Sequence, residues 1–79
     1  MRKHTYDQFY QGVRESLKER LSCYKITDEQ LDKYLEEEEK QVRGGFKSYT
    51  EKDQSDPRTD DVIFNSQVNA TAMCLEYCY

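Results

Sequence analysis

Two near-identical motifs, each directly ahead of a run with helical periodicity, constrain the fold of this chain more than any other feature. In the first, Thr5 is followed three residues later by Gln8, and in the second, Thr27 is followed by Gln30. A threonine at a helix start accepts a hydrogen bond from the N–H three residues on, and a glutamine there bonds back to the threonine N–H. We therefore expect one helix to start after each threonine.

The residues after the first motif have the spacing of one helix face. Apolar side chains recur every four positions, and three tyrosines widen the stripe: Phe9, Val13, Leu17, Leu21, Tyr6, Tyr10 and Tyr24. Charged residues fill the positions between them, as on the solvent side of an amphipathic helix. The pattern predicts a first helix over residues 6–22.

The second motif is the stronger one, because Ile26 and Leu31 flank the Thr27 cap at the positions of a hydrophobic staple. An apolar stripe follows at helical spacing, and Glu38 stands on it where an apolar residue is expected. The stripe consists of Leu31, Tyr34, Leu35, Val42, Phe46 and Tyr49. A second helix is therefore expected to start at residue 28.

The pair Gly44-Gly45 leaves the end of this second helix open to two interpretations. The glycines can form a C-cap, or they can be a weak point inside a longer helix at a cost of roughly 1 kcal/mol per glycine. We favour the first interpretation, a helix over residues 28–43. Phe46 and Tyr49 would then fold back onto the core.

A polar stretch over residues 51–61 separates the second helix from a third. It offers two candidate helix starts, Asp56-Pro57 and Thr59. Two adjacent apolar stripes follow, made of Ile63, Gln67, Ala70, Cys74, Tyr77 and of Phe64, Val68, Thr71, Leu75, Cys78. We expect a third helix over residues 59–77 that packs centrally against the other two, because its apolar face is the broadest.

The length of the chain limits what these helices can build. A chain of 79 residues forms one domain and buries only about 60% of its unfolded surface, so an enclosed active-site cavity is not expected. We predict an all-α, small three-helix bundle in which residues 1–79 form a single helical domain. The chain shows no apolar stretch typical of a membrane span or a signal peptide, and its three cysteines cannot all pair with one another. These features predict a cytoplasmic protein without membrane contact.

Charge is unevenly distributed along a chain whose formal net charge is −4. The first helix is basic and the second acidic, and the simplest interpretation is attraction across their shared seam, at about 0–1 kcal/mol per exposed pair. The alternative is a negative strip that imitates a nucleic-acid backbone and inhibits a nucleic-acid-processing enzyme. Its residues would be Glu36, Glu37 and Glu39, together with Asp28, Glu29 and Asp32. Direct binding of nucleic acid is not expected, because the basic residues form no single patch.

Tyrosines near helix ends are a second candidate binding surface. Tyr24 and Tyr49 lie at expected helix ends, and Tyr77 and Tyr79 lie at the C-terminus. Aromatic residues are enriched at protein interfaces, so these four could form a patch that binds a protein partner. Formation of a homo-oligomer, most simply a homodimer, is one form of such binding.

Few residues could support catalysis or bind a metal. Cys74 and Cys78 lie four positions apart, and Cys23 with His4 would complete a four-ligand zinc set. The spacing differs from that of familiar structural zinc sites, His4 lies in a terminus that is expected to fray, and such cysteines are more often buried. His4 is also the single histidine that could serve as base for a thiol nucleophile. We expect no catalytic residues, no metal and no cofactor.

Three segments of the chain together carry a resemblance. They are Tyr6-Asp7-Gln8-Phe9-Tyr10, Ile26-Thr27-Asp28-Glu29-Gln30-Leu31 and Ala70-Thr71-Ala72-Met73-Cys74-Leu75-Glu76-Tyr77-Cys78-Tyr79. In this order they resemble short uncharacterised proteins of Gram-positive mobile elements. The resemblance implies a cytoplasmic accessory protein of a conjugative transposon or prophage and supplies no functional residues. We expect a non-enzymatic protein-binding accessory or regulatory module, with the acidic decoy as the alternative.

Overall fold

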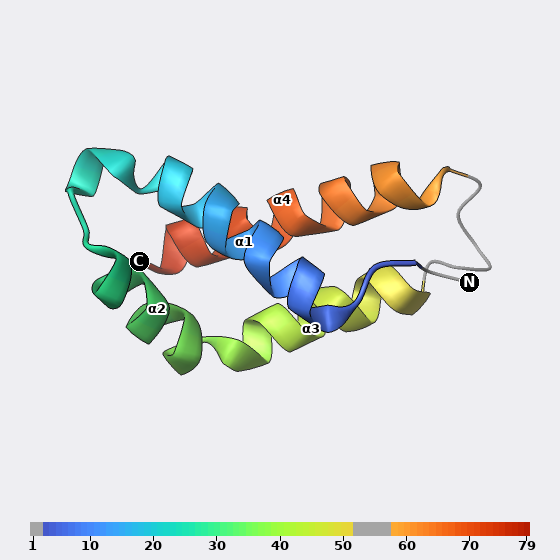
Figure 1. Ribbon diagram of the computed structural model, residues 1–79, viewed down its shortest axis with the longest axis horizontal. Coiled ribbons are helices and arrows are strands. Elements are labelled where there is room, and N and C mark those ends of the chain that lie inside the picture. The colour runs from blue at the N-terminus through green and yellow to red at the C-terminus, as the bar shows by residue number, and fades with distance from the viewer. Residues whose placement is uncertain (1–2, 52–57) are drawn as a thin grey trace.

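The computed structural model describes residues 3–51 and 58–79, and the regular structure in these ranges is helical. Within them, four α-helices follow one another: α1 (Tyr6–Arg20), α2 (Asp28–Glu37), α3 (Glu39–Glu51) and α4 (Asp60–Cys78), with a 3-10 turn η1 (Ser22–Tyr24) after α1. Figure 1 shows α1 and α4 running in the same general direction, with α2 and α3 returning in the opposite one. The predicted all-α class is confirmed, but the predicted number of helices is wrong.

Both capping motifs form as the sequence predicts. The Thr5 hydroxyl accepts a hydrogen bond from the Gln8 N–H at 3.2 Å, and Gln8 Oε1 accepts one from the Thr5 N–H at 2.8 Å. Thr27 and Gln30 repeat this geometry, with distances of 3.1 and 2.9 Å. The starts of α1 and α2 are therefore set by hydrogen bonds between residues three positions apart.

The first helix ends at Arg20, earlier than the predicted end at residue 22. The chain tightens into η1 and then passes through Lys25, whose φ of 55° lies in the left-handed region. Leu21, the last apolar residue of the predicted stripe, is still buried. The short turn thus keeps the chain against the core while it reverses direction.

The predicted second helix, residues 28–43, is wrong at its C-terminal end. The helix breaks at Glu38 (φ −105°, ψ 25°), and α3 begins at the next residue. A straight helix would place Glu38 in line with Leu35 and Val42, where its carboxylate would lose its hydration. With the bend, Glu38 is only half-buried, while Leu35 and Val42 both lie in the core.

The glycine pair lies inside α3 and does not cap it. Gly45 is buried where α3 meets α4, and a Cβ at this position would overlap the Thr71 hydroxyl. Gly44 has open space around it. Gly45 therefore permits the close approach of the two helices, and Phe46 and Tyr49 continue α3 instead of folding back as expected.

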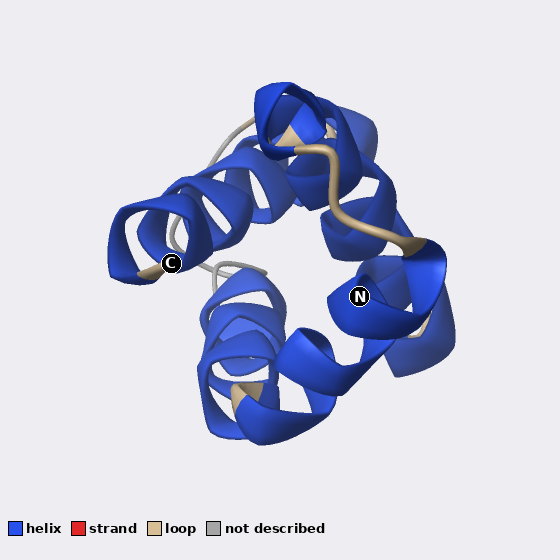
Figure 2. Cartoon of the chain, turned by 90° about the vertical axis from the view of Figure 1, so that its left-hand side faces the viewer, coloured by secondary structure: helices blue, strands red, loops and turns tan. Residues whose placement is uncertain are grey.

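The core lies where α1 meets α3 and α4. Its buried apolar side chains come from all four α-helices and from the turn after α1: Phe9, Val13, Leu17, Leu21, Leu31, Leu35, Val42, Tyr49, Ile63, Val68, Ala72 and Leu75. α4 packs against both α1 and α3, as its broad apolar face predicts. Figure 2 shows the helices arranged around the long axis of the molecule. The molecule is elongated, with extents of 39 × 20 × 18 Å.

α4 starts after Thr59, the second of the two candidate helix starts. The Thr59 hydroxyl accepts a hydrogen bond from the Val62 N–H at 3.4 Å. The other candidate, Asp56-Pro57, lies outside the described residues. The helix covers Asp60–Cys78, one residue later at each end than the predicted range.

The two apolar stripes of α4 lie in different environments. The stripe that begins at Phe64 is mostly buried, through Val68, Thr71 and Leu75. The stripe that begins at Ile63 is buried only at that residue, and its later members Ala70, Cys74 and Tyr77 are exposed. Because α1 and α3 cover one side of α4, most of the Ile63 stripe is left at the surface.

Candidate interaction surface

The solvent side of α4 carries almost no charge, in a chain in which 35% of the residues are charged. From residue 62 onward the single acidic side chain is that of Glu76, and it forms an ion pair with Arg20 of α1 at 3.2 Å. Five exposed residues of this side are here called the α4 outer face: Val62, Ser66, Asn69, Met73 and Tyr77. Val62, Met73 and Tyr77 are 48%, 42% and 82% exposed. Exposed aromatic and Met side chains without charge are typical of the centre of a protein interface.

A cluster of tyrosines, here called the aromatic end, lies beside the last turn of α4. It consists of Tyr24, Tyr34 and Tyr79. Tyr24 of η1 stacks on Tyr79 with ring centroids 5.6 Å apart, and the Tyr34 ring of α2 lies 5.3 Å from Tyr79. The Tyr34 hydroxyl donates a hydrogen bond to the Leu75 carbonyl at 2.8 Å, so its ring is held in place. Burial raises the pKa of Tyr34, and the Glu38 carboxylate adds to this effect.

The structure separates the four tyrosines that the sequence singles out. Tyr24 and Tyr79 stack together, and Tyr77 is exposed on the last turn of α4. Tyr49 is fully buried, and its hydroxyl donates a hydrogen bond to Asp60 Oδ1 at 2.6 Å. Burial raises the pKa of Tyr49, and the hydrogen bond to the Asp60 carboxylate raises it further. Because α3 continues past the glycines, Tyr49 faces the core and is not part of the exposed tyrosine surface.

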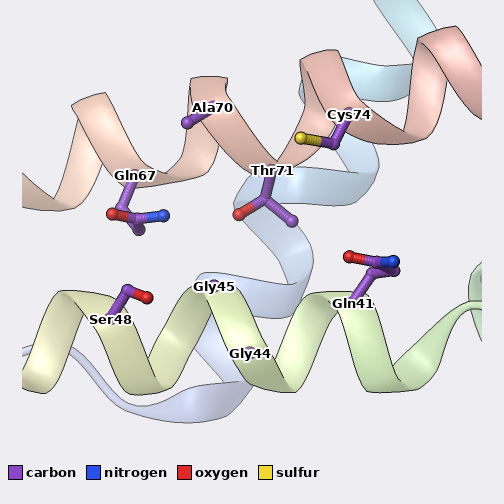
Figure 3. Close-up of a pocket in the computed structure, with 8 residues that line it drawn as sticks. All are labelled: Gln41, Gly44, Gly45, Ser48, Gln67, Ala70, Thr71 and Cys74. Carbon is purple, nitrogen blue, oxygen red and sulfur yellow. The ribbon is translucent and has the colours of Figure 1, made fainter.

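A shallow groove of about 180 Å³ lies between α3 and α4 (Figure 3). Its lining is uncharged, and it consists of Gln41, Gly44, Gly45 and Ser48 from α3 and Gln67, Ala70, Thr71 and Cys74 from α4. Ala70 and Cys74 directly follow Asn69 and Met73 of the α4 outer face in the sequence. The uncharged surface therefore extends from the outer side of α4 toward α3.

The acidic α2 lies beside the basic α1, as the simpler interpretation of the charges predicts. Arg14 Nε lies 2.7 Å from Asp32 Oδ1, and Lys18 Nζ lies 2.9 Å from Asp28 Oδ1. The Lys18 ammonium lowers the pKa of Asp28 through its hydrogen bond and its charge. Two members of the predicted negative strip are thus paired with cations of the neighbouring helix.

The remaining acids of the strip have different surroundings. Glu39 forms an ion pair with Arg43, one turn further along α3, at 2.8 Å. Glu36 and Glu37 are exposed at the end of α2, and neither has a cation within 4 Å in the described part of the chain. Glu29, in the first turn of α2, is exposed as well. The strip is therefore reduced to Glu29 and a short acidic edge, Glu36 and Glu37, at the bend between α2 and α3.

His4 is anchored and does not fray as the sequence suggested. Its ring Nδ1 lies 2.7 Å from Asp60 Oδ2, and its backbone N–H donates a hydrogen bond to the Tyr49 hydroxyl at 3.1 Å. Its ring also stacks on the Phe64 ring, with the two centroids 3.8 Å apart. Burial of Asp60 opposes ionisation, but hydrogen bonds from Tyr49, the Lys3 N–H and His4 outweigh it and lower the pKa of Asp60. These contacts tie the start of α1 to α3 and α4.

One group of side chains in residues 3–51 and 58–79 has the spacing of a metal site: His4, Asp60 and Asp61. Asp60 already accepts the Tyr49 hydroxyl with one oxygen and contacts His4 with the other. His4 Nε2 lies 3.7 Å from Asp61 Oδ1, and the Asp61 side chain is 86% exposed. The arrangement is that of a hydrogen-bonded clasp between the N-terminal segment and α4.

The cysteines do not assemble with His4 into the four-ligand set. His4 contacts Asp60 at the start of α4, whereas Cys74 lies fourteen residues further along, about 21 Å at the rise of an α-helix. The same separation keeps the imidazole away from the thiols of α4. Cys23, Cys74 and Cys78 are all exposed, so the expectation of buried cysteines is wrong. Cys74 lies on the uncovered side of α4, and Cys78 is the last residue of that helix.

Comparison with known protein families, with curated proteins and with solved structures finds no match to this chain. Among the described residues, every helix is too short or too polar to cross a membrane.

Proposed function

We propose that this protein is a non-enzymatic protein-binding module, accessory or regulatory to its partner, and that it binds through the α4 outer face and the adjoining aromatic end. The observation that carries the proposal is that all five members of the α4 outer face are exposed and uncharged. Ion pairs cover the exposed flank between α1 and α2. The α4 outer face presents Val62, Met73 and Tyr77 to water instead.

The energetic argument favours a protein as the ligand of this face. Full burial of a side chain such as Val or Met contributes about 1.5–3 kcal/mol relative to its exposed state. A partner would gain this contribution without removing water from a charged group. The free energy lost on such desolvation is often larger than the free energy gained from the new ion pair. The stacked rings of Tyr24 and Tyr79 add a rigid aromatic surface of the kind that dominates binding energies.

The alternative function, an acidic decoy for a nucleic-acid-processing enzyme, rests on Glu36 and Glu37. These two carboxylates are exposed at the bend, where a basic groove of such an enzyme could contact them. The pairing of Asp28, Asp32 and Glu39 with cations shortens the negative strip that this function needs. We therefore place the decoy second.

Affinity capture from a nuclease-treated bacterial lysate, followed by quantitative mass spectrometry, separates the two functions. One variant combines Met73→Lys with Tyr77→Lys on the α4 outer face, and a second combines Glu36→Lys with Glu37→Lys on the acidic edge. Gln11→Lys, at an exposed position of α1, controls for added positive charge. Circular dichroism confirms that each variant is folded.

The proposed function requires that proteins captured by the native chain are lost with the α4 variant and kept with the other two. Partners that survive the α4 variant would show that this face does not bind them. A nucleic-acid-processing enzyme lost only with the acidic-edge variant would establish the decoy in place of the module. The mobile-element setting implied by the sequence resemblance is part of the same proposal, and the identity of the captured proteins tests it.

A further inference from the structure

The groove between α3 and α4 contains a buried hydroxyl that the fold leaves without a hydrogen bond. Thr71 is only 5% exposed, and no group in residues 3–51 and 58–79 donates to its hydroxyl or accepts from it. Figure 3 shows its oxygen on the side of α4 that faces α3, between Gln67 and Gln41. A buried hydroxyl without a partner lowers stability, so native proteins contain few of them. The Thr71 hydroxyl therefore faces a position where a bound molecule would satisfy it.

Three further polar side chains line the same groove. They are the carboxamides of Gln41 and Gln67 and the hydroxyl of Ser48. None of these three side chains forms a hydrogen bond within the part of the chain that the structure describes. A carboxamide and a hydroxyl can each donate and accept a hydrogen bond. Because Gln41 and Ser48 belong to α3 and Gln67 to α4, both walls of the groove offer donors and acceptors.

The lining of the groove disfavours several kinds of ligand. It contains no charged side chain that would bind a phosphate or an acidic motif, and no aromatic ring on which a base or a polyproline helix would stack. An amphipathic helix needs large apolar side chains in its groove, and this lining has none. The volume, about 180 Å³, is also below the roughly 300–1000 Å³ of small-molecule sites. Hydrogen bonding to an uncharged, narrow ligand remains.

The length of the groove matches a short stretch of extended peptide. Gln41 and Ser48 lie seven positions apart on α3, and Gln67 and Cys74 lie seven positions apart on α4. Seven positions of α-helix cover about 10 Å, which is the length of about three residues of extended chain. Each of those residues presents one N–H and one C=O. The donors and acceptors of an extended main chain thus recur along the same distance as the polar groups of the two walls.

Small residues between these polar groups give a main chain access to the groove. Gly44, Gly45 and Ala70 belong to the lining. A Cβ added at Gly44 would meet nothing outside its own helix within 4 Å. Glycine is favoured where a backbone approaches a ligand closely, because no side chain intervenes.

We propose that the groove between α3 and α4 binds an extended, uncharged peptide segment of a protein partner through hydrogen bonds to its main chain. Gln41, Gln67, Ser48 and Thr71 supply the hydrogen bonds. The inference rests on the proposed function, because it names the part of the partner that lies next to the α4 outer face. The contact is short, so the dissociation constant of an isolated segment is expected to be on the order of 1 mM.

Nuclear magnetic resonance titration with a blocked peptide tests the proposal. The probe is N-acetyl-trialanine N-methylamide, which is uncharged and offers its main chain alone. It should shift the backbone amide signals of Gly44, Gly45 and Thr71 in a saturable manner, and it should leave those of Gln11 on α1 unchanged. The control is the same peptide with every alanine N–H methylated, which removes the alanine donors and should bind at least about tenfold more weakly.

The thiol of Cys74, at one end of the groove, provides a second measurement. Saturating peptide should slow its alkylation by N-ethylmaleimide at least about threefold, as measured by mass spectrometry. Cys23 in η1 is exposed and lies outside the groove lining, so its rate should stay the same. The two thiols are compared within one sample.

Two sets of variants test the named side chains. Gln41→Ala combined with Gln67→Ala should weaken peptide binding at least about tenfold, and Gln11→Ala, at an exposed glutamine outside the groove, should leave it within about twofold. Thr71→Ala should weaken binding about threefold to tenfold. Thr71→Ser loses the same methyl group but keeps the hydroxyl, so it should bind like the native chain.

Three results would overturn the proposal. They are an absence of shifts at about ten times the expected dissociation constant, equal binding of the peptide and its methylated control, and binding that the double glutamine variant leaves unchanged. None of them bears on the proposed function, because the capture experiment uses Met73→Lys with Tyr77→Lys, which leaves the groove lining intact. Conversely, a failed capture experiment with a bound peptide would refute the α4 outer face and keep the groove.

Discussion

Gly45 of α3 lies directly against Thr71 of α4, so closely that a single added methyl group would overlap the threonine hydroxyl. The two residues are 26 positions apart in the chain, and their contact sets the spacing of the two helices that line the groove. A Cβ added at Gly44, the preceding residue, would meet nothing outside its own helix within 4 Å. The pair therefore provides a matched comparison within one turn of helix.

Gly45→Ala should destabilise the fold by about 1–2 kcal/mol, because the steric cost of overpacking, about 1–3 kcal/mol, exceeds the gain in helix propensity. Gly44→Ala should stabilise the fold by up to about 1 kcal/mol, because it gains propensity in open space. Urea unfolding followed by circular dichroism measures both. Equal effects of the two substitutions would mean that α3 and α4 are not in close contact at Gly45.

Asp60 should contribute to the loss of stability in acid. Its pKa is lower in the folded protein than its ordinary value of 3.8. A group with a lowered folded pKa stabilises the fold above its unfolded pKa, and this contribution is lost as the pH falls through the folded pKa. The contribution of Asp60 is therefore present above about pH 4 and disappears below it.

Asp60→Asn tests this titration, because asparagine keeps an acceptor for the Tyr49 hydroxyl but does not ionise. The decrease in unfolding free energy between pH 6 and pH 3 should be smaller in this variant than in the native chain. Asp61→Asn, at a carboxylate that is 86% exposed, should leave the decrease nearly unchanged. The same decrease in all three proteins would refute the role of the His4 clasp in acid stability.

The seam between α1 and α2 should respond to charge reversal. Arg14→Glu would place a carboxylate beside Asp28 and Asp32, and we expect a loss of about 1 kcal/mol that shrinks in 0.5 M salt. Combining Arg14→Glu with Asp32→Arg restores opposite charges at the 2.7 Å contact and should recover most of the loss. Thermal unfolding at two salt concentrations measures the effect. A double variant no more stable than the single one would show that the pair does not interact in solution.

All three cysteines should react with a thiol reagent in the folded, dilute protein, because each is exposed. Titration without denaturant should therefore reach three thiols per chain. A titration that stops at fewer than three thiols per chain would contradict this exposure.

The sequence predicts the capped starts of α1, α2 and α4 well, but it misses the break at Glu38 and the place of Gly45 inside α3. The hydrogen bonds at the starts of α1 and α2 join Thr5 to Gln8 and Thr27 to Gln30. Each therefore depends on residues only three positions apart in the sequence. The position of Gly45 depends on Thr71 in another helix. No local pattern distinguishes a glycine that ends a helix from one that lets a second helix approach.

The same distinction applies to the candidate surface. Glu76 is the single charged side chain after residue 61, and this is visible in the sequence, but the side of α4 that stays uncovered depends on how α1 and α3 pack on it. Tyr49 could not be excluded from the surface in advance, because its hydroxyl partner, Asp60, lies across a polar stretch. The sequence analysis does not place Tyr34 in the aromatic end, because the hydrogen bond that holds its ring there joins it to the Leu75 carbonyl, 41 positions away in the chain.

The bend at Glu38 has a consequence for how the molecule opens. α2 is a separate helix of ten residues, which is too short to persist alone in water. It packs against α1 and α3, and it reaches α4 through the Tyr34 hydroxyl. Hydrogen exchange should therefore detect α2 as the first unit of local unfolding, with its amides exchanging earlier than those at the centres of α1 and α4. A straight helix through position 38 would have joined these amides to α3 in one cooperative unit.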